Sequence, residues 1–162
     1  MTWRGTTTVS DRIFASLVYL LPLLDVVGFV GQILVRTGSF LSPLVNLVAT
    51  PLLPLLSIYT GFIPLIVFFA LFLLVVRNEN ISHFIRFNTM QAILFGIVLS
   101  LISIIWQYAL YPAFGMGLLT QTLFNAVFLG TIAAVGYSIV QTALGRYAEI
   151  PTISDAVYMQ VR

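Results

Sequence analysis

Long apolar segments, separated by short polar ones, dominate the chain. Residues 37–76 and 87–145 contain no Asp, Glu, Lys or Arg, and both are rich in Leu, Ile and Phe. A transmembrane helix needs about 20 predominantly apolar residues, so the chain has room for four crossings. The polar breaks place these predicted spans at about 13–35, 52–76, 88–107 and 121–144, and Gly61 and Pro64 are expected to interrupt the second.

The unbroken length of these segments predicts the fold class. In lipid, every backbone N–H and C=O group must be paired within the protein, so only helices and closed barrels cross a bilayer. Barrel strands are segments of about ten residues with alternating polarity, whereas the segments here are longer and apolar throughout. We therefore predict an all-α, polytopic membrane protein of one domain, with polar tails at 1–12 and 145–162.

Composition supports this prediction and excludes several function classes. The chain is 60% hydrophobic and 7% charged, whereas about a quarter of the residues of a soluble domain are charged. It has no Cys and one His, which leaves little material for a metal site. We see no catalytic triad, phosphate-binding glycine loop or paired carboxylates, so we predict no enzyme, metal or cofactor. The seven scattered Arg residues form no basic stripe for nucleic acid.

The regions beside the spans carry local signals. Ser10 or Asp11 is predicted to cap the first helix. Residues 40–51 are apolar but too short to cross a bilayer, and we expect a loop or an interfacial segment there. Residues 81–91 are predicted to form an interfacial helix before the third span. Residues 107–117, beside several aromatic side chains, are predicted to form a turn at the membrane interface.

The arginines predict the topology. With four spans, both tails and the turn around residues 77–80 share one side of the membrane. That side holds six arginines and the other side holds Arg36 alone; the six are Arg4, Arg12, Arg77, Arg86, Arg146 and Arg162. Because basic residues concentrate in cytoplasmic loops, we predict both termini in the cytoplasm, or in the stroma of a plastid.

Small residues recur at every fourth position in the third and fourth predicted spans. They are Ala92, Gly96 and Ser100 in one span, and Ala126, Gly130, Ala134 and Ser138 in the other. Between helices in lipid, small residues permit close backbone approach. We predict that the two spans form a tight antiparallel hairpin. The alternative is that one of these ridges is a face for homo-oligomerisation.

Asp25 lies near the middle of the first predicted span. A carboxylate at that depth costs about 3 kcal/mol on insertion scales and is paired or functional as a rule. One hypothesis is a contact for an ion, a proton or a substrate. The other is an acid that is protonated or hydrogen-bonded and joins two helices, with Ser100, Gln107 or Asn125 as its partner.

A second group of polar residues lies at the start of the third span. His83, Phe87, Met90 and Gln91 fall on one face of a helix, with Arg86 at its edge. This face is either a recognition surface or part of an interfacial helix whose Arg86 extends toward lipid phosphates.

Three segments together resemble a known family. They are SDRIF leading to YLLPL (10–14 and 19–23), FIRFNTMQA (84–92) and IPTISDAV (150–157). This pattern is similar to the Tic20 family, the 20 kDa subunit of the translocon at the inner chloroplast envelope, with its cyanobacterial and algal-plastid relatives. The positions that match the most specific family motif are Arg86, Phe87, Asn88 and Gln91.

The resemblance implies a four-helix membrane subunit of a protein-translocating complex that helps to form a pore. It implies membrane lipids, other membrane subunits and precursor polypeptides as partners, and termini on the cytoplasmic or stromal side. Plant members carry a transit peptide, whereas the first span here begins after about a dozen residues. The chain therefore resembles a cyanobacterial member of the plasma or thylakoid membrane, or a plastid-encoded member of the inner envelope.

Two other functions stay open at this point. Asp25 and the scattered polar residues of the spans suit a small-solute channel or transporter. The small-residue ridges suit a scaffold or assembly factor that holds other membrane proteins.

Overall fold

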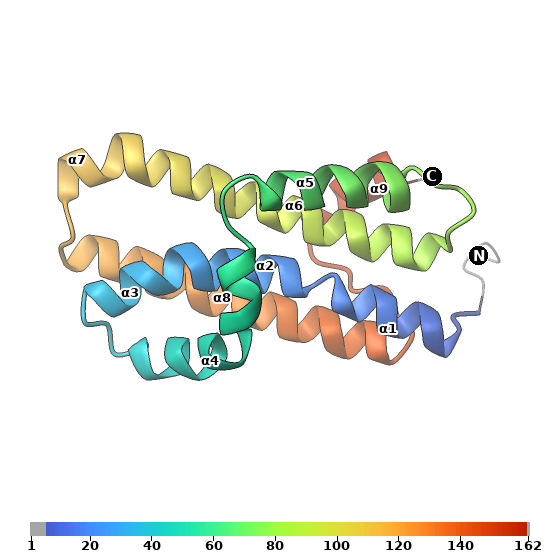
Figure 1. Cartoon of the computed structure of the whole chain (residues 1–162), viewed down its shortest axis with the longest axis horizontal. Helices are drawn as coiled ribbons and strands as arrows, with labels where there is room; N and C mark the ends of the chain where they lie inside the picture. Colours follow the sequence, from blue (N-terminus) through green and yellow to red (C-terminus); the bar gives the residue numbers. More distant parts are fainter. Residues whose placement is uncertain (1–5, 162) are drawn as a thin grey trace.

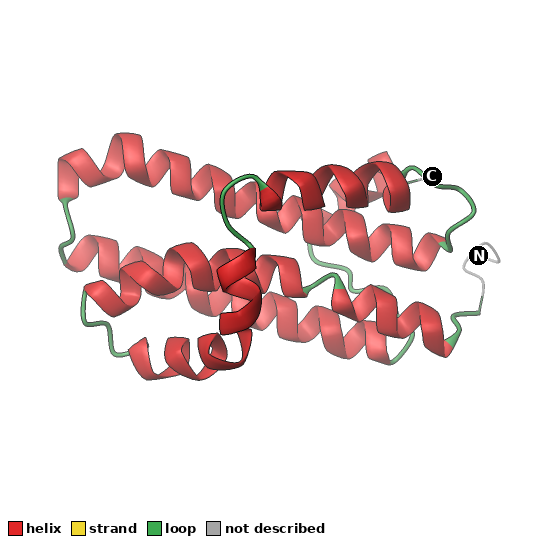
Figure 2. Ribbon diagram, in the orientation of Figure 1, coloured by secondary structure: helices red, strands yellow, loops and turns green. Residues whose placement is uncertain are grey.

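The computed structural model describes residues 6–161 (Figure 1). Every regular element in this range is helical, as Figure 2 shows. The all-α prediction is confirmed.

The first helical segment runs from Val9 to Arg36, a length of 28 residues. It contains α1 (Val9–Leu17), α2 (Leu20–Asp25), the π-helical turn η1 (Val26–Gly31) and α3 (Gln32–Arg36). The hydroxyl of Thr8 accepts from the Asp11 N–H (3.1 Å), and the Asp11 carboxylate accepts from the Thr8 N–H (2.9 Å). This reciprocal pair is a capping box. The cap is therefore Thr8 rather than Ser10 or Asp11, and Asp11 is its partner.

The second predicted span is broken. Helix α4 (Ser42–Ile58) continues through Pro51 and Pro54, so most of residues 40–51 are helical rather than a loop. The chain then bends by 91° before α5 (Ile63–Leu71) and the π-helical turn η2 (Phe72–Val76). Gly61 lies in the bend with φ of 60°, a backbone conformation that favours glycine. The second predicted span, with its interruption expected at Gly61 and Pro64, is thus two helices joined by a sharp bend.

The third helical segment is longer than predicted. It combines α6 (His83–Ile105), the π-helical turn η3 (Trp106–Leu110) and α7 (Tyr111–Phe114) into 32 residues. Residues 83–91 are the first turns of α6, so the separate interfacial helix is a wrong prediction. The turn expected over 107–117 is confined to 115–117, because the helix continues to Phe114.

The last two helices are α8 (Leu118–Ala143) and α9 (Ile153–Gln160). Within the described range, the first, third and α8 segments are long and apolar enough to cross a membrane. The bent pair α4 and α5 makes a fourth crossing if the pair is one span. The chain is a membrane protein with three to four helices that can span the bilayer.

The packing of the long helices differs from the predicted hairpin. Helices α1 and α2 lie between α6 and α8 and pack on both (Figure 1), whereas α6 and α8 hardly meet over the described residues. The small ridges therefore do not face each other. A Cβ at Gly96 would lie 3.0 Å from the Asp25 Oδ2 atom, and a Cβ at Gly130 would have no neighbour within 4 Å.

The remaining ridge residues divide between surface and interior. Ser100 and Ala126 are exposed, Ala134 is half-buried, and Ala92 and Ser138 are buried. Ala92 packs in a small cluster with Tyr19 and Val135. The N-terminal helix thus takes the place beside α6 that was expected for α8.

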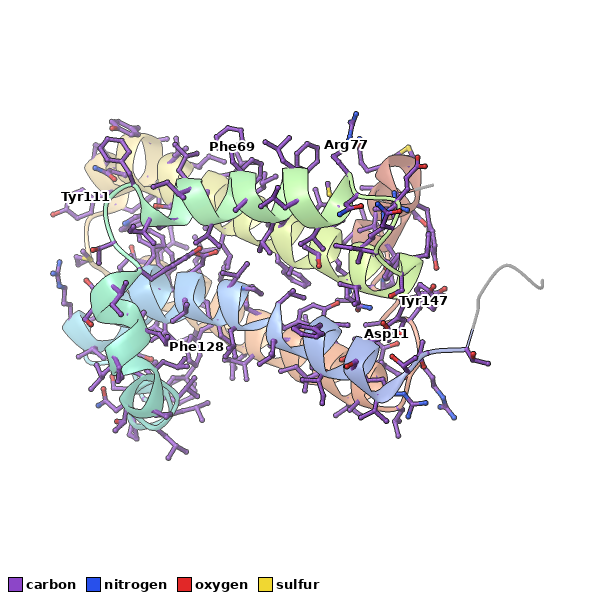
Figure 3. All side chains as sticks on the ribbon, turned by 45° about the vertical axis from the view of Figure 1, so that its right-hand side comes forward. Asp11, Phe69, Arg77, Tyr111, Phe128 and Tyr147 are labelled. Atoms are coloured by element: carbon purple, nitrogen blue, oxygen red, sulfur yellow. The ribbon has the colours of Figure 1, made fainter. Side chains whose placement is uncertain are left out.

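The described parts of both tails and the turn after η2 meet at one end of the molecule (Figure 1). The Ser82 hydroxyl donates to the Asp11 carboxylate (3.2 Å), and His83 Nδ1 lies 3.0 Å from the Tyr147 hydroxyl. Figure 3 shows Asp11, Arg77 and Tyr147 at this end and Tyr111 at the other. Arg36 lies near Tyr111, since both line one cavity. The arginines expected on one side thus share one end of the fold, apart from Arg4 and Arg162, which lie outside the described residues.

Candidate functional site

Gln91 is the centre of a buried hydrogen-bond network. Its side chain is 0% exposed. The Nε2 group donates to the Tyr19 hydroxyl (2.9 Å) and to the Ala148 carbonyl (2.7 Å), and Oε1 accepts from the Ser154 hydroxyl (3.0 Å). One amide thus joins the N-terminal helices, α6 and the C-terminal segment.

The neighbours of Gln91 complete the network. The Tyr19 hydroxyl donates to Asn88 Oδ1 (2.8 Å), and Asn88 Nδ2 donates to the Phe84 carbonyl (2.8 Å). Ser154 Oγ accepts from the Ile150 N–H (2.6 Å). We call Tyr19, Asn88, Gln91 and Ser154, with the backbone groups they bind, the Gln91 network. Buried polar groups are tolerated in an apolar interior when they are hydrogen-bonded, and each side chain of this network is.

Aromatic packing surrounds the network. Phe87 is 0% exposed, and its ring centroid lies 5.0 Å from that of Tyr147 and 4.9 Å from that of Tyr158. Met90 belongs to the same apolar cluster as Val157 of α9. The helix face proposed as a recognition surface is therefore covered by the C-terminal segment of the same chain.

Arg86 binds within the protein. Its Nε donates to the Val76 carbonyl (2.9 Å) at the end of η2. A guanidinium near the last carbonyls of a helix satisfies acceptors that have no partner within that helix. Arg86 thus ties the start of α6 to the end of the preceding helix.

Ser154 was not among the site residues expected from the sequence. It is 5% exposed, and Val157 on the same helix is buried as well. Their spacing of three residues places both side chains on one face of α9. That spacing is the signal that could have identified α9 as a packed element.

Asp25 forms a second and different polar region. It ends α2 and is half-buried, and the Tyr59 phenol is the polar side chain that faces it. Gly96 of α6 leaves room for the carboxylate, since a Cβ there would lie 3.0 Å from Oδ2. Of the expected partners, Asn125 instead accepts from the Ser39 hydroxyl.

Two cavities meet at Asp25. One of about 410 Å³ lies between α2, α5 and α6, and Ser100 is on its wall. The other, about 760 Å³, lies between η1, α3 and α4, and its polar lining includes Gln32, Arg36, Asn46, Ser57 and Thr60. Asp25, Tyr59 and Pro64 line both cavities. Tyr59 lies in the bend between α4 and α5, so its position depends on the bend angle.

Within residues 6–161, no three His, Cys, Asp or Glu side chains gather in a group that could hold a metal ion.

Comparison with known proteins identifies the family. Residues 9–157 match the family model described as chloroplast import apparatus Tic20-like. This chain belongs to the Tic20 family. A Tic20 family protein of Synechocystis sp. is 50% identical, and the alignment covers 100% of this chain and 99% of the relative.

More distant relatives include a protein with a chloroplastic name. The Tic20 family protein Ycf60 of Gracilaria tenuistipitata var. liui is 34% identical, over 95% of this chain and 76% of its own length. Protein TIC 20-v, chloroplastic, of Arabidopsis thaliana is 29% identical, over 94% of this chain and 71% of its own length. The resemblance drawn from the three sequence segments is confirmed.

All three segments that carried the Tic20 resemblance contribute to the Gln91 network. Tyr19 comes from the first, Asn88 and Gln91 from the second, and Ser154 from the third. In this Tic20 chain, the three segments together therefore join the N-terminal helices and the C-terminal segment to α6.

Proposed function

We propose that this chain is a membrane subunit of a protein-translocation complex that acts on precursor polypeptides together with partner membrane proteins. The observation that carries the proposal is similarity over the full chain to a Tic20 family protein, in a family described by its link to chloroplast import. Relatives with chloroplastic names align over nearly the whole chain as well.

The arrangement of helices supports a role in a complex. Since α1 and α2 occupy the space between α6 and α8, a passage for a polypeptide would lie between this chain and another rather than inside one copy. Wide apolar faces are available for such contacts; exposed examples on α5 and α6 are Leu65, Ile66, Phe69, Leu101, Ile104 and Ile105.

The topology that suits this role has four crossings, with α4 and α5 as one broken crossing. Both termini then lie on the cytoplasmic or stromal side, because Arg12, Arg77, Arg86 and Arg146 lie at the end where the tails meet. A reporter fused after Arg162 should be active only on that side. Activity on the opposite side would overturn the orientation.

Part of the ridge on α8 is a candidate contact face. Ala126 and Gly130 are exposed on it, and a Cβ at Gly130 would meet nothing within 4 Å. Gly130→Leu should dissociate the native complex on a blue native gel, since close helix approach needs a small residue. Gly136→Leu is the matched control, because Gly136 is equally free of neighbours and points to another side of the helix.

The deciding experiment is purification of the tagged chain in a mild detergent, followed by mass spectrometry of the proteins that accompany it. The proposal expects membrane proteins of a translocation complex in stoichiometric amounts, together with precursor chains. An unrelated tagged membrane protein of similar size is the control. The chain alone or as a homo-oligomer would favour a channel or transporter, and a photosynthetic or respiratory complex would favour an assembly factor.

A further inference from the structure

Asp25 is a carboxylate at mid-membrane depth that the chain itself leaves without a cationic partner among the described residues. It lies near the centre of the Val9–Arg36 segment, and the polar side chain that faces it is the Tyr59 phenol. Ionisable groups inside membranes pair with one another or line a pathway. The surroundings of Asp25 therefore indicate what it binds.

The cavity between α2, α5 and α6 opens to the surface of the helices. Turn η2 packs on α6, whereas α5 diverges from it, and the resulting cavity of about 410 Å³ has Leu65 and Leu101 on its wall. These two side chains are 52% and 53% exposed, so the cavity is reachable from the side.

The lining of this cavity is apolar except at its deepest part. Leucine, isoleucine and phenylalanine side chains form most of the wall, and Asp25, Tyr59 and Ser100 supply the polar groups. A purely apolar occupant would leave the carboxylate unpaired. Water alone would leave the apolar side chains of the wall exposed to solvent, which is unfavourable. An alkyl stem that ends in a cation satisfies both, as in a lysine or an arginine side chain.

The depth of Asp25 indicates where the cation comes from. The hydrocarbon core is about 30 Å thick, so lipid headgroups lie roughly 15 Å from its centre. A side chain on another membrane-embedded helix reaches that depth without leaving the bilayer. We propose that this cavity binds a lysine or arginine carried by an otherwise apolar helix of another polypeptide, with Asp25 as the counter-ion.

The second cavity explains how the carboxylate persists before a partner arrives. Its polar lining, with Arg36 among the residues farther along it, gives Asp25 a more polar surrounding than the apolar cavity, and a charge is tolerated better there. The proposal of this site rests on the proposed function in one respect: another polypeptide must meet this chain inside the membrane.

The test uses the full chain in phosphatidylcholine nanodiscs and a labelled Leu/Ala transmembrane peptide with one central lysine. A peptide with norleucine at that position is the matched probe, and association is measured by energy transfer. We expect at least a tenfold preference for the lysine peptide. Asp25→Asn should abolish the preference, and Asp155→Asn, which changes an exposed carboxylate on α9, should leave it intact.

Two further variants make the result independent of a folding defect. Asp25→Lys should prefer a peptide with a central aspartate, which a misfolded protein would not do. Gly96→Ala should weaken the lysine preference several-fold, since its Cβ would lie 3.0 Å from Oδ2. Equal binding of the two peptides by the wild-type chain, or a preference that survives Asp25→Asn, would overturn the site.

The outcome is separable from that of the purification. A lysine preference without translocation partners would leave the site standing and remove the proposed function. Translocation partners without a lysine preference would support the proposed function and overturn the site.

Discussion

The Gln91 network and the Asp25 region both place polar side chains inside an apolar helical protein, and they differ in where the partners lie. In the network, Gln91 binds the Tyr19 hydroxyl, the Ala148 carbonyl and the Ser154 hydroxyl, all in the same chain. Asp25 faces one phenol and two cavities. An unpaired polar group in lipid is costly. The first region therefore stabilises the fold, whereas the second has the partner that we propose outside the chain.

This contrast predicts opposite responses to substitution. Changes in the Gln91 network should lower stability and affect function only through folding. Changes at Asp25 should leave stability nearly unchanged and remove binding.

The largest expected effect comes from Gln91→Leu. The substitution leaves the Ala148 carbonyl and the Ser154 hydroxyl without their partner in a buried site, and each unsatisfied group costs about 1–3 kcal/mol. We expect a loss of about 3 kcal/mol or more in the free energy of unfolding, measured by denaturant titration in detergent micelles. Gln107→Leu, at an exposed position, is the control and should change the free energy of unfolding by less than about 0.5 kcal/mol. Equal effects of the two variants would contradict the network.

A smaller loss is expected from Gly145→Ala. Gly145 follows α8 with φ of 73°, and a Cβ there would lie 2.9 Å from Arg12 Nε. Backbone strain of this kind costs about 1–3 kcal/mol, so the thermal midpoint should fall. The matched variant Gly130→Ala, in a helix and without neighbours within 4 Å, should leave the midpoint unchanged or raise it slightly. A fall of the same size in both variants would contradict a special cost of a side chain at Gly145.

Tyr19→Phe removes one hydroxyl from the network and should cost about 1 kcal/mol. Tyr137→Phe, at an exposed position of α8, is its control. Because Tyr19 and Ser154 both bind Gln91, the effects of Tyr19→Phe and Ser154→Ala should be non-additive in a double-mutant cycle. Strict additivity would mean that the two hydroxyls act independently.

The smallest effect on stability is expected from Asp25→Asn, within about 0.5 kcal/mol of the wild type in the same denaturant titration. The carboxylate has no cationic partner among the described residues, so its removal breaks no ion pair there. A loss as large as that of Gln91→Leu would show that Asp25 stabilises the fold, as the Gln91 network does, and would contradict the difference between the two regions.

The sequence predicted some helix boundaries closely and missed others. Helix α8 (Leu118–Ala143) lies within three residues of the predicted 121–144 at each end, because glycines flank it on both sides. Gly61 and Pro64 marked an interruption of the second span, but its angle of 91° was not predicted, since prolines and glycines are common in transmembrane helices and do not specify an angle. The pairing of α6 with α8 was wrong because small residues mark close approach without naming the partner helix.

By itself, the sequence determined that this is an all-helical membrane protein of the Tic20 family. Those properties depend on composition, on the length of apolar segments and on local motifs. The tertiary structure alone decided which polar groups are satisfied. Gln91 bonds residues 72, 57 and 63 positions away, and Asp25 is left between two cavities. The reason is physical: a hydrogen bond across helices depends on which helix lies next to which, and no local pattern carries that information.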